Sequence, residues 1–210
     1  LSYIRKTCSV HSGMHGQMSR NLHPRRGAEI MIERMKRLKR ELMYKGSILD
    51  IYKDTMEFAN GKQEEWDFVS HRMGAAAILP VLPDGRIVMV RQYRNALERE
   101  TLEIPAGARD SKTEDTSVCA ARELEEETGY KSKHVEFLLS LRTTVAFCDE
   151  FVDVYLATDL EKGKQHLDDA ESIDIEIYTL DELCQMIYSG ELQDSKTVAA
   201  IMAYSNKVKG

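Results

Sequence analysis

The stretch of sequence that decides the fold is GARDSKTEDTSVCAARELEEETGY, residues 107–130. It predicts a helix over about residues 115–128, followed by Gly129 at the position where a left-handed residue ends a helix. Ser111 and Glu114 have the spacing of a capping box just before this helix. Small and apolar side chains recur every three to four residues and predict its buried face: Val118, Ala121, Leu124 and Thr128.

The second half of this helix carries four glutamates within five positions, which repel one another unless solvent, cations or a metal dilute the charge. Glu123 and Glu127 are four residues apart and share one face, and Glu126 flanks that face. Their carboxylates are hard oxygen ligands of the kind that suits Mg²⁺ or Mn²⁺. Arg122 can hold one of them through a bidentate pair. Taken alone, the cluster is also compatible with a solvated acidic helix face.

The residues around the cluster favour the metal site over the solvated face. Together they resemble the Nudix box, G-x5-E-x7-R-E-U-x-E-E-x-G-U, in which U is an aliphatic or bulky apolar residue. The match runs from Gly107 through Glu114 and Arg122 to Gly129. It departs from the pattern in one extra residue between Gly107 and Glu114, which falls in a loop, and in Tyr130 at the last U position.

Two runs before the box resemble the ADP-ribose pyrophosphatase branch of the Nudix hydrolases: VRQYR at 90–94 and LEIPAG at 102–107. The resemblance covers about residues 40–206. It implies an α/β fold, the Nudix α/β/α sandwich with a mixed sheet, plus a small N-terminal antiparallel sheet. In this branch the small sheet is exchanged between the subunits of a homodimer and helps to build the substrate site.

The resemblance also implies a metal site. Carried over residue by residue, it makes Glu123, Glu126 and Glu127 ligands of Mg²⁺, with Mn²⁺ as the alternative, together with the backbone carbonyl of Ala106. Arg122 would orient the carboxylates, so that Arg122 and Glu126 also count among the catalytic residues. Metals of this kind neutralise the charge of a diphosphate and lower the pKa of a bound water.

The general base of this branch comes from an acidic loop after the main strands, which corresponds here to residues 167–173. Glu171 is the first candidate, and Asp169, two residues earlier, is the second. A solvated acidic loop is the alternative interpretation for both. Closure of this loop over the substrate would complete the site.

Four further residues are candidates for substrate binding. Arg91 and Arg94 lie three apart on a predicted strand and point to opposite faces, so at most one contacts a phosphate directly, with Arg94 preferred. Arg72 lies at the junction of the N-terminal hairpin with the main domain, where this branch often places a residue that contacts base or phosphate. Glu103, just before Pro-Ala-Gly, could contact ribose or metal, or serve in strand pairing.

The chain divides into three predicted regions: a disordered or non-native leader (1–30), an N-terminal arm and small dimerisation sheet (31–73), and the Nudix catalytic domain (74–210). Residues 31–43 suit either a short basic helix or an extended arm. Asn60-Gly61 predicts a hairpin turn within residues 46–71. The later elements are predicted as a β-hairpin at 75–94, strands at 101–104, 135–142, 151–157 and 173–178, a helix capped at Thr179 and ending near Gly190, and a helix at about 194–206.

Composition limits the partners of this chain of 210 residues. A formal net charge of −6 argues against the uniformly basic surface of a nucleic-acid binder, and no run approaches the apolar length of a membrane span. The four cysteines form no CxxC pair, which favours free thiols in a reducing compartment. The first 30 residues lack the apolar core of a signal peptide. We therefore expect a cytoplasmic protein.

Together these features predict a Mg²⁺-dependent Nudix hydrolase that cleaves the diphosphate of ADP-ribose, or of a related ADP-sugar, to AMP and a sugar phosphate. Its expected partners are a small nucleoside diphosphate sugar and a second copy of the chain, without nucleic acid or membrane. One alternative is a Nudix hydrolase of nucleoside triphosphates or other dinucleotides, because the box handles only the diphosphate. A non-enzymatic alternative is a nucleotide-binding sensor.

Overall fold

The structure is a computed structural model that describes residues 35–167 and 172–209. All of them belong to one compact unit, Arg34–Gly210. The predicted leader (1–30) and the two candidates for the general base, Asp169 and Glu171, lie outside the described residues.

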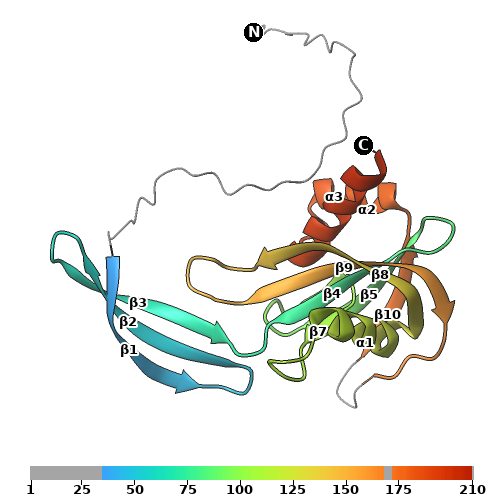
Figure 1. The fold of residues 1–210 in the computed structure, drawn as a ribbon. Coiled ribbons are helices and arrows are strands. Elements are labelled where there is room, and N and C mark those ends of the chain that lie inside the picture. Colours follow the sequence, from blue (N-terminus) through green and yellow to red (C-terminus); the bar gives the residue numbers. More distant parts are fainter. Residues whose placement is uncertain (1–34, 168–171, 210) are drawn as a thin grey trace, which may run out of the picture. The chain divides into compact units, whose positions relative to one another are not determined.

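The chain from Met35 to His71 forms a three-stranded antiparallel sheet in the order β1-β2-β3 (Figure 1). Its strands are β1 (Met35–Lys45), β2 (Leu49–Phe58) and β3 (Gln63–His71). Of the predicted segment 31–43, residues 31–34 lie outside the described residues, and for residues 35–43 strand β1 confirms the extended alternative. The turn predicted at Asn60-Gly61 is also confirmed, since Gly61 has a φ of 79° and the Asn60 side chain accepts a hydrogen bond from the Lys62 N–H.

Two further sheets build the rest of the molecule. One has four strands in the order β7-β4-β9-β8 and is mixed, because β4 pairs with β9 in parallel and the other pairs are antiparallel. The other has three antiparallel strands in the order β10-β5-β6. The strands are β4 (Ala75–Pro80), β5 (Ile87–Arg94), β6 (Arg99–Glu103), β7 (Ala106–Ala108), β8 (Tyr130–Arg142), β9 (Phe151–Lys162) and β10 (Ile173–Tyr178).

The β-hairpin predicted at 75–94 is wrong. Its two strands, β4 and β5, belong to different sheets, and Val81, just after β4, forms an isolated bridge with Ile87 of β5. Strand β4 is buried almost throughout and pairs on both edges, with β7 and with β9, so no edge remains for β5. A Pro-Asp-Gly turn therefore connects two sheets rather than two paired strands.

Three helices cover the sheets: α1 (Thr116–Thr128), α2 (Leu180–Ser189) and α3 (Ser195–Lys209). Helix α1 packs on the four-stranded sheet through one apolar cluster: Ala76, Ile78, Cys119, Ala120, Leu124, Tyr155 and Ala157. A second cluster joins both sheets to α2 and α3 and includes Leu79, Met89, Ile104, Val154, Leu183 and Ile201. Figure 1 shows α1 apart from the α2–α3 pair. This arrangement confirms the predicted α/β architecture with a mixed sheet.

The N-cap of helix α1 and its buried face both differ from the prediction. Asp115, not Ser111, is its N-cap, and the Asp115 side chain accepts the Ser117 N–H. Ser111 instead accepts the Glu114 N–H and closes a turn upstream of the helix. Val118 is 58% exposed and Ala121 is also exposed, because the buried face runs through other positions: Cys119, Ala120, Glu123, Leu124, Glu127 and Thr128. The glutamates therefore share the buried face.

The remaining boundaries agree with the prediction or extend it. Gly129 ends α1 with a φ of 71°, and Thr179 forms a capping box with Glu182 at the start of α2. Strands β8 and β9 are longer than predicted, since β8 begins at Tyr130 and β9 continues to Lys162. Within the described ranges, no helix has the length and apolar character needed to cross a membrane.

Candidate active site

Helix α1 places two carboxylates at its buried face, close to the short strand β7. Glu123 is 8% exposed and Glu127 is 4% exposed. A Cβ atom added to Gly107 would lie 2.1 Å from Oε1 of Glu123, so only a glycine leaves room for that carboxylate. Oε2 of Glu127 accepts a hydrogen bond from the Ala106 N–H at 3.2 Å. The Ala106-Gly107 backbone and the two glutamates therefore fit against each other.

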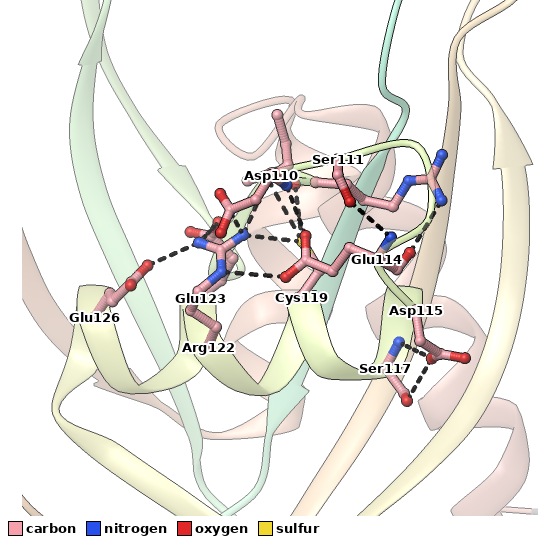
Figure 2. A network of polar contacts seen from close by, with 12 residues as sticks. Asp110, Ser111, Glu114, Asp115, Ser117, Cys119, Arg122, Glu123 and Glu126 are labelled. Atoms are coloured by element: carbon pink, nitrogen blue, oxygen red, sulfur yellow. Dashed lines mark hydrogen bonds and ion pairs between the residues drawn. The ribbon is translucent and has the colours of Figure 1, made fainter.

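Arg122 lies at the centre of a polar network on the same helix (Figure 2). Its Nη1 donates to Glu123 at 2.7 Å and to Glu126 at 2.9 Å, and its Nε donates to Glu114 at 3.4 Å. A fourth carboxylate, that of Asp110, lies 3.6 Å from Nη2. Burial alone would lower the pKa of Arg122, but the charge of Glu123 and the hydrogen bond with Glu126 outweigh it and raise the pKa. One guanidinium thus holds four carboxylates in place.

The extra residue before Glu114 is absorbed in the loop between β7 and α1. Oε2 of Glu114 accepts the Asp110 N–H at 2.6 Å, while Oε1 faces Arg122. Arg109 braces the same loop, since it donates to the backbone carbonyls of Lys112 and Glu114. Glu114 therefore still reaches Arg122 despite the insertion.

The resemblance to the Nudix box implies a divalent metal, and the side chains present fit one by their donor chemistry. The carboxylates at the buried face of α1 supply hard oxygens, which Mg²⁺ and Mn²⁺ prefer. Because Gly107 has no side chain, the Glu123 carboxylate can lie against the backbone that precedes the helix. Among residues 35–167 and 172–209, however, no three His, Cys, Asp or Glu side chains form a group already arranged to hold a metal.

A cavity of about 340 Å³ opens beside Gly107. Arg94 and Lys196 contribute its positive charges, and Ala106 and Ala108 contribute to its wall. Nε and Nη2 of Arg94 donate to the two carboxylate oxygens of Glu103, at 2.7 and 2.6 Å. Two of the predicted substrate-binding residues therefore come together next to the predicted metal site.

Glu103 is ionised in this environment. It is 2% exposed, and burial alone would raise its pKa, but hydrogen bonds and charges from Arg94 and Lys196 outweigh the burial and lower the pKa to about 2. A buried carboxylate in this state has to stay paired, because an unpaired buried charge is strongly unfavourable. Glu103 and Arg94 therefore act as one unit.

The other two predicted substrate residues lie in separate ion pairs. Arg91 donates to Glu176 of β10, although it also lines a second cavity together with Arg94. Arg72 donates to Asp50 at 3.0 Å and to the backbone carbonyls of Gly46 and Ser47. The structure thus places Arg72 at the turn between β1 and β2.

The sequence reasoning missed Asp194, Lys196 and Thr197, at the start of α3. Lys196 bonds to Glu103, and Thr197 accepts the Ile104 N–H at 2.9 Å. Asp194 accepts from both of these α3 side chains. The available signal was Asp194 at the first position of the helix predicted at about 194–206, which is compatible with an N-cap but gives no sign of the strand that the cap meets.

Comparisons with known proteins identify the family profile and the relatives that this chain resembles. A profile of the NUDIX domain matches residues 71–201. The methanol dehydrogenase activator of Bacillus methanolicus is 40% identical over 168 residues, which cover 79% of this chain and 90% of that protein. The ADP-ribose pyrophosphatase of Bacillus subtilis (strain 168) is 39% identical with the same coverage. An ADP-ribose pyrophosphatase of Mycobacterium tuberculosis is 33% identical and covers 78% of this chain and 79% of its own.

A solved structure, that of an ADP compounds hydrolase, resembles this fold with a TM-score of 0.77. The likeness covers 85% of this chain and 96% of the other, at 21% sequence identity. At that identity it supports the fold alone. The NUDIX profile, in contrast, spans more than half of this chain and includes all of α1. The chain therefore belongs to the Nudix family.

Proposed function

We propose that this protein is a Nudix hydrolase that cleaves the diphosphate of ADP-ribose, or of a related ADP-sugar, to AMP and a sugar phosphate. The observation that carries the proposal is the pair of buried carboxylates, Glu123 and Glu127, fitted against the Ala106-Gly107 backbone. The substrate follows from the relatives named ADP-ribose pyrophosphatase, at 39% and 33% identity over most of the chain.

The proposed metal ligands are Glu123, Glu126 and Glu127 with the backbone carbonyl of Ala106, and the proposed metal is Mg²⁺, with Mn²⁺ as a substitute. When bound, such an ion supplies positive charge that offsets the diphosphate and acidifies water. The role of Arg122 is to hold Glu123 and Glu126 in orientation, which is supported by its bonds to both.

The remaining proposed roles concern substrate binding and proton transfer, and the cavity beside Gly107 supports the first of them. Arg94 binds a phosphate of the substrate, and Glu103 holds Arg94 in place. Arg91 and Arg72 are proposed as secondary substrate contacts. Glu171, or else Asp169, takes the proton of the attacking water.

The test is product analysis with purified protein, ADP-ribose and Mg²⁺. We expect release of AMP and ribose phosphate, and a loss of more than about a thousandfold in rate in Glu127→Gln. Glu125→Gln is the matched control, since Glu125 lies on the same helix but pairs with Lys131 at 2.8 Å. The proposal fails if wild type releases no AMP, or if both variants retain the same activity.

We also propose that two copies of the chain associate through the region 31–73 and that the catalytic domain occupies 74–210. The support is a set of large apolar side chains exposed on the β1–β3 sheet and its connection: Met35, Leu38, Leu42, Met43, Tyr44, Ile48 and Trp66. Methionine and aromatic side chains, which this set includes, are enriched at protein interfaces. Sedimentation equilibrium should give twice the chain mass, and a monomer at micromolar concentration would contradict this.

We also propose that the protein is located in the cytoplasm. Three cysteines, Cys119, Cys148 and Cys184, are free thiols, as expected of a reducing compartment. Fractionation of the native host cells with detection by antibody would test this location.

A further inference from the structure

Lys196 is the second residue of α3, and no sequence pattern marks it as a site residue. Its side chain is only 13% exposed, although lysine usually extends into solvent. Nζ donates to Oε2 of Glu103 and, at 3.0 Å, to Oδ2 of Asp194. The same side chain lines both the cavity beside Gly107 and the second cavity beneath the β5–β6 turn. Lys196 therefore stands between the two cavities.

The carboxylate that Lys196 reaches accepts hydrogen bonds at both of its oxygens. Oε1 of Glu103 accepts from Nε of Arg94 at 2.7 Å and from the Thr101 hydroxyl at 2.6 Å. Oε2 accepts from Nη2 of Arg94 at 2.6 Å and from Lys196. These four bonds use about all the acceptor capacity of a carboxylate. Glu103 is thus fixed in orientation as well as ionised.

The position of Lys196 is itself fixed by the buried start of α3. Asp194 accepts the Thr197 N–H at 3.0 Å and the Thr197 hydroxyl at 2.6 Å. Thr197, which is fully buried, in turn accepts the Ile104 N–H at 2.9 Å. Because Ile104 lies two residues before Ala106, this chain of bonds ties α3 to the backbone beside the carboxylates of α1.

The bonds at Glu103 also fix the orientation of the Arg94 guanidinium. Its Nε and Nη2 are held by Glu103, while its Nη1 makes no hydrogen bond within the described ranges and its side chain is 40% exposed at the cavity wall. A guanidinium held along one edge is a preorganised donor for an anion at the other, since a planar fork loses little freedom on binding.

We propose that Lys196 is a positioning residue for substrate binding: through Glu103 it holds Arg94 in the orientation that receives a phosphate of the substrate. This inference rests on the proposed function for the identity of the substrate. Lys196 acts through another side chain, so its removal weakens binding more than it slows the chemical step.

The test is steady-state kinetics of Lys196→Met with ADP-ribose. We expect KM to rise about tenfold, the loss of one charge-assisted hydrogen bond, with kcat within about twofold of wild type. Lys196→Arg should restore most of the affinity because it returns the charge and the donors. Lys207→Met is the matched control on the same helix, since Lys207 pairs with Glu136 on the surface, and it should leave KM unchanged.

A double-mutant cycle separates positioning from loss of folding. In an Arg94→Met background, Lys196→Met should raise KM by less than about twofold, because the residue through which it acts is gone. The same rise in KM in both backgrounds would overturn the inference, as would a fall in kcat with KM unchanged.

If wild type releases no AMP, the proposed function is wrong, and the positioning can still be tested by NMR titration of the Glu103 carboxyl. Lys196→Met should then raise the pKa of Glu103, and Lys207→Met should not. An unchanged titration in Lys196→Met would overturn the inference independently of activity.

Discussion

The molecule holds two polar networks that differ in their ratio of carboxylates to cations. At α1, the single guanidinium of Arg122 is shared by four carboxylates, those of Asp110, Glu114, Glu123 and Glu126. At β6, the single carboxylate of Glu103 is shared by two cations. The first network is rich in negative charge and suits an added cation. The second is balanced within the chain once Asp194, which also pairs with Lys196, is counted, and this suits a structural support for Arg94.

The comparison of the two networks can be tested by substitution, and we expect the largest loss of stability from Glu103→Gln. The substitution leaves two cations facing a neutral amide, and loss of one partner of a buried pair costs about 3 kcal/mol or more of the free energy of unfolding. Urea denaturation at pH 7 measures it. Glu176→Gln is the matched control, because the Glu176 side chain is 29% exposed, against 3% for Glu103, and its loss should cost about 1 kcal/mol or less. Equal costs would contradict the balance assigned to Glu103.

The pH dependence of the same variant tests the ionisation of Glu103. Its pKa in the folded protein is about 2, below the ordinary value of 4.5. Its stabilisation is therefore complete above about pH 4.5 and is lost as the pH falls toward 2. The difference in free energy of unfolding between wild type and Glu103→Gln should thus be constant from pH 7 to 5. It should shrink by about 1–2 kcal/mol between pH 5 and 3. A constant difference down to pH 3 would show that the carboxylate is not held in its ionised form.

Gly107→Ala should break the α1 network without removing a charge. The added methyl group would overlap the carboxylate of Glu123, and a displacement of about 1 Å in an active site costs roughly a hundredfold in rate. The measurement is kcat/KM for ADP-ribose. Gly85→Ala is the control, since a Cβ there meets nothing within 4 Å and only the positive φ is strained. An active Gly107→Ala enzyme would exclude this packing of Glu123.

The smallest effect is expected from Glu114→Gln. Among the carboxylates hydrogen-bonded to Arg122, Glu114 is the most distant, at 3.4 Å, and three other carboxylates continue to hold the guanidinium. We expect kcat/KM to fall about threefold, which corresponds to less than 1 kcal/mol. A loss of activity as large as that expected of Glu127→Gln would indicate that Glu114 binds the metal rather than holding Arg122.

Much of the site could be predicted because it lies within one local pattern. The spacing of Glu123 and Glu127 on a helix fixes their shared face, and Gly107 stands close to them in the chain. The direction of that face was harder to predict. Periodicity favoured Val118 and Ala121 as buried, yet a helix that buries two glutamates violates the polarity rule on which periodicity rests.

The parts that sequence reasoning missed depend on contacts between distant residues. Lys196 and Glu103 are 93 positions apart, and no local pattern links a lysine after an N-cap to a strand. The false hairpin at 75–94 has a similar cause, because a turn between two strands does not specify whether they pair with each other or join different sheets.

The central claim, that the network at α1 takes an added divalent cation, is tested most directly by titration of Mn²⁺ followed by electron paramagnetic resonance. The account predicts that wild type and Glu125→Gln bind Mn²⁺ with the same affinity and that Glu127→Gln binds it at least about tenfold more weakly. Equal binding of Mn²⁺ by wild type and Glu127→Gln would contradict the account.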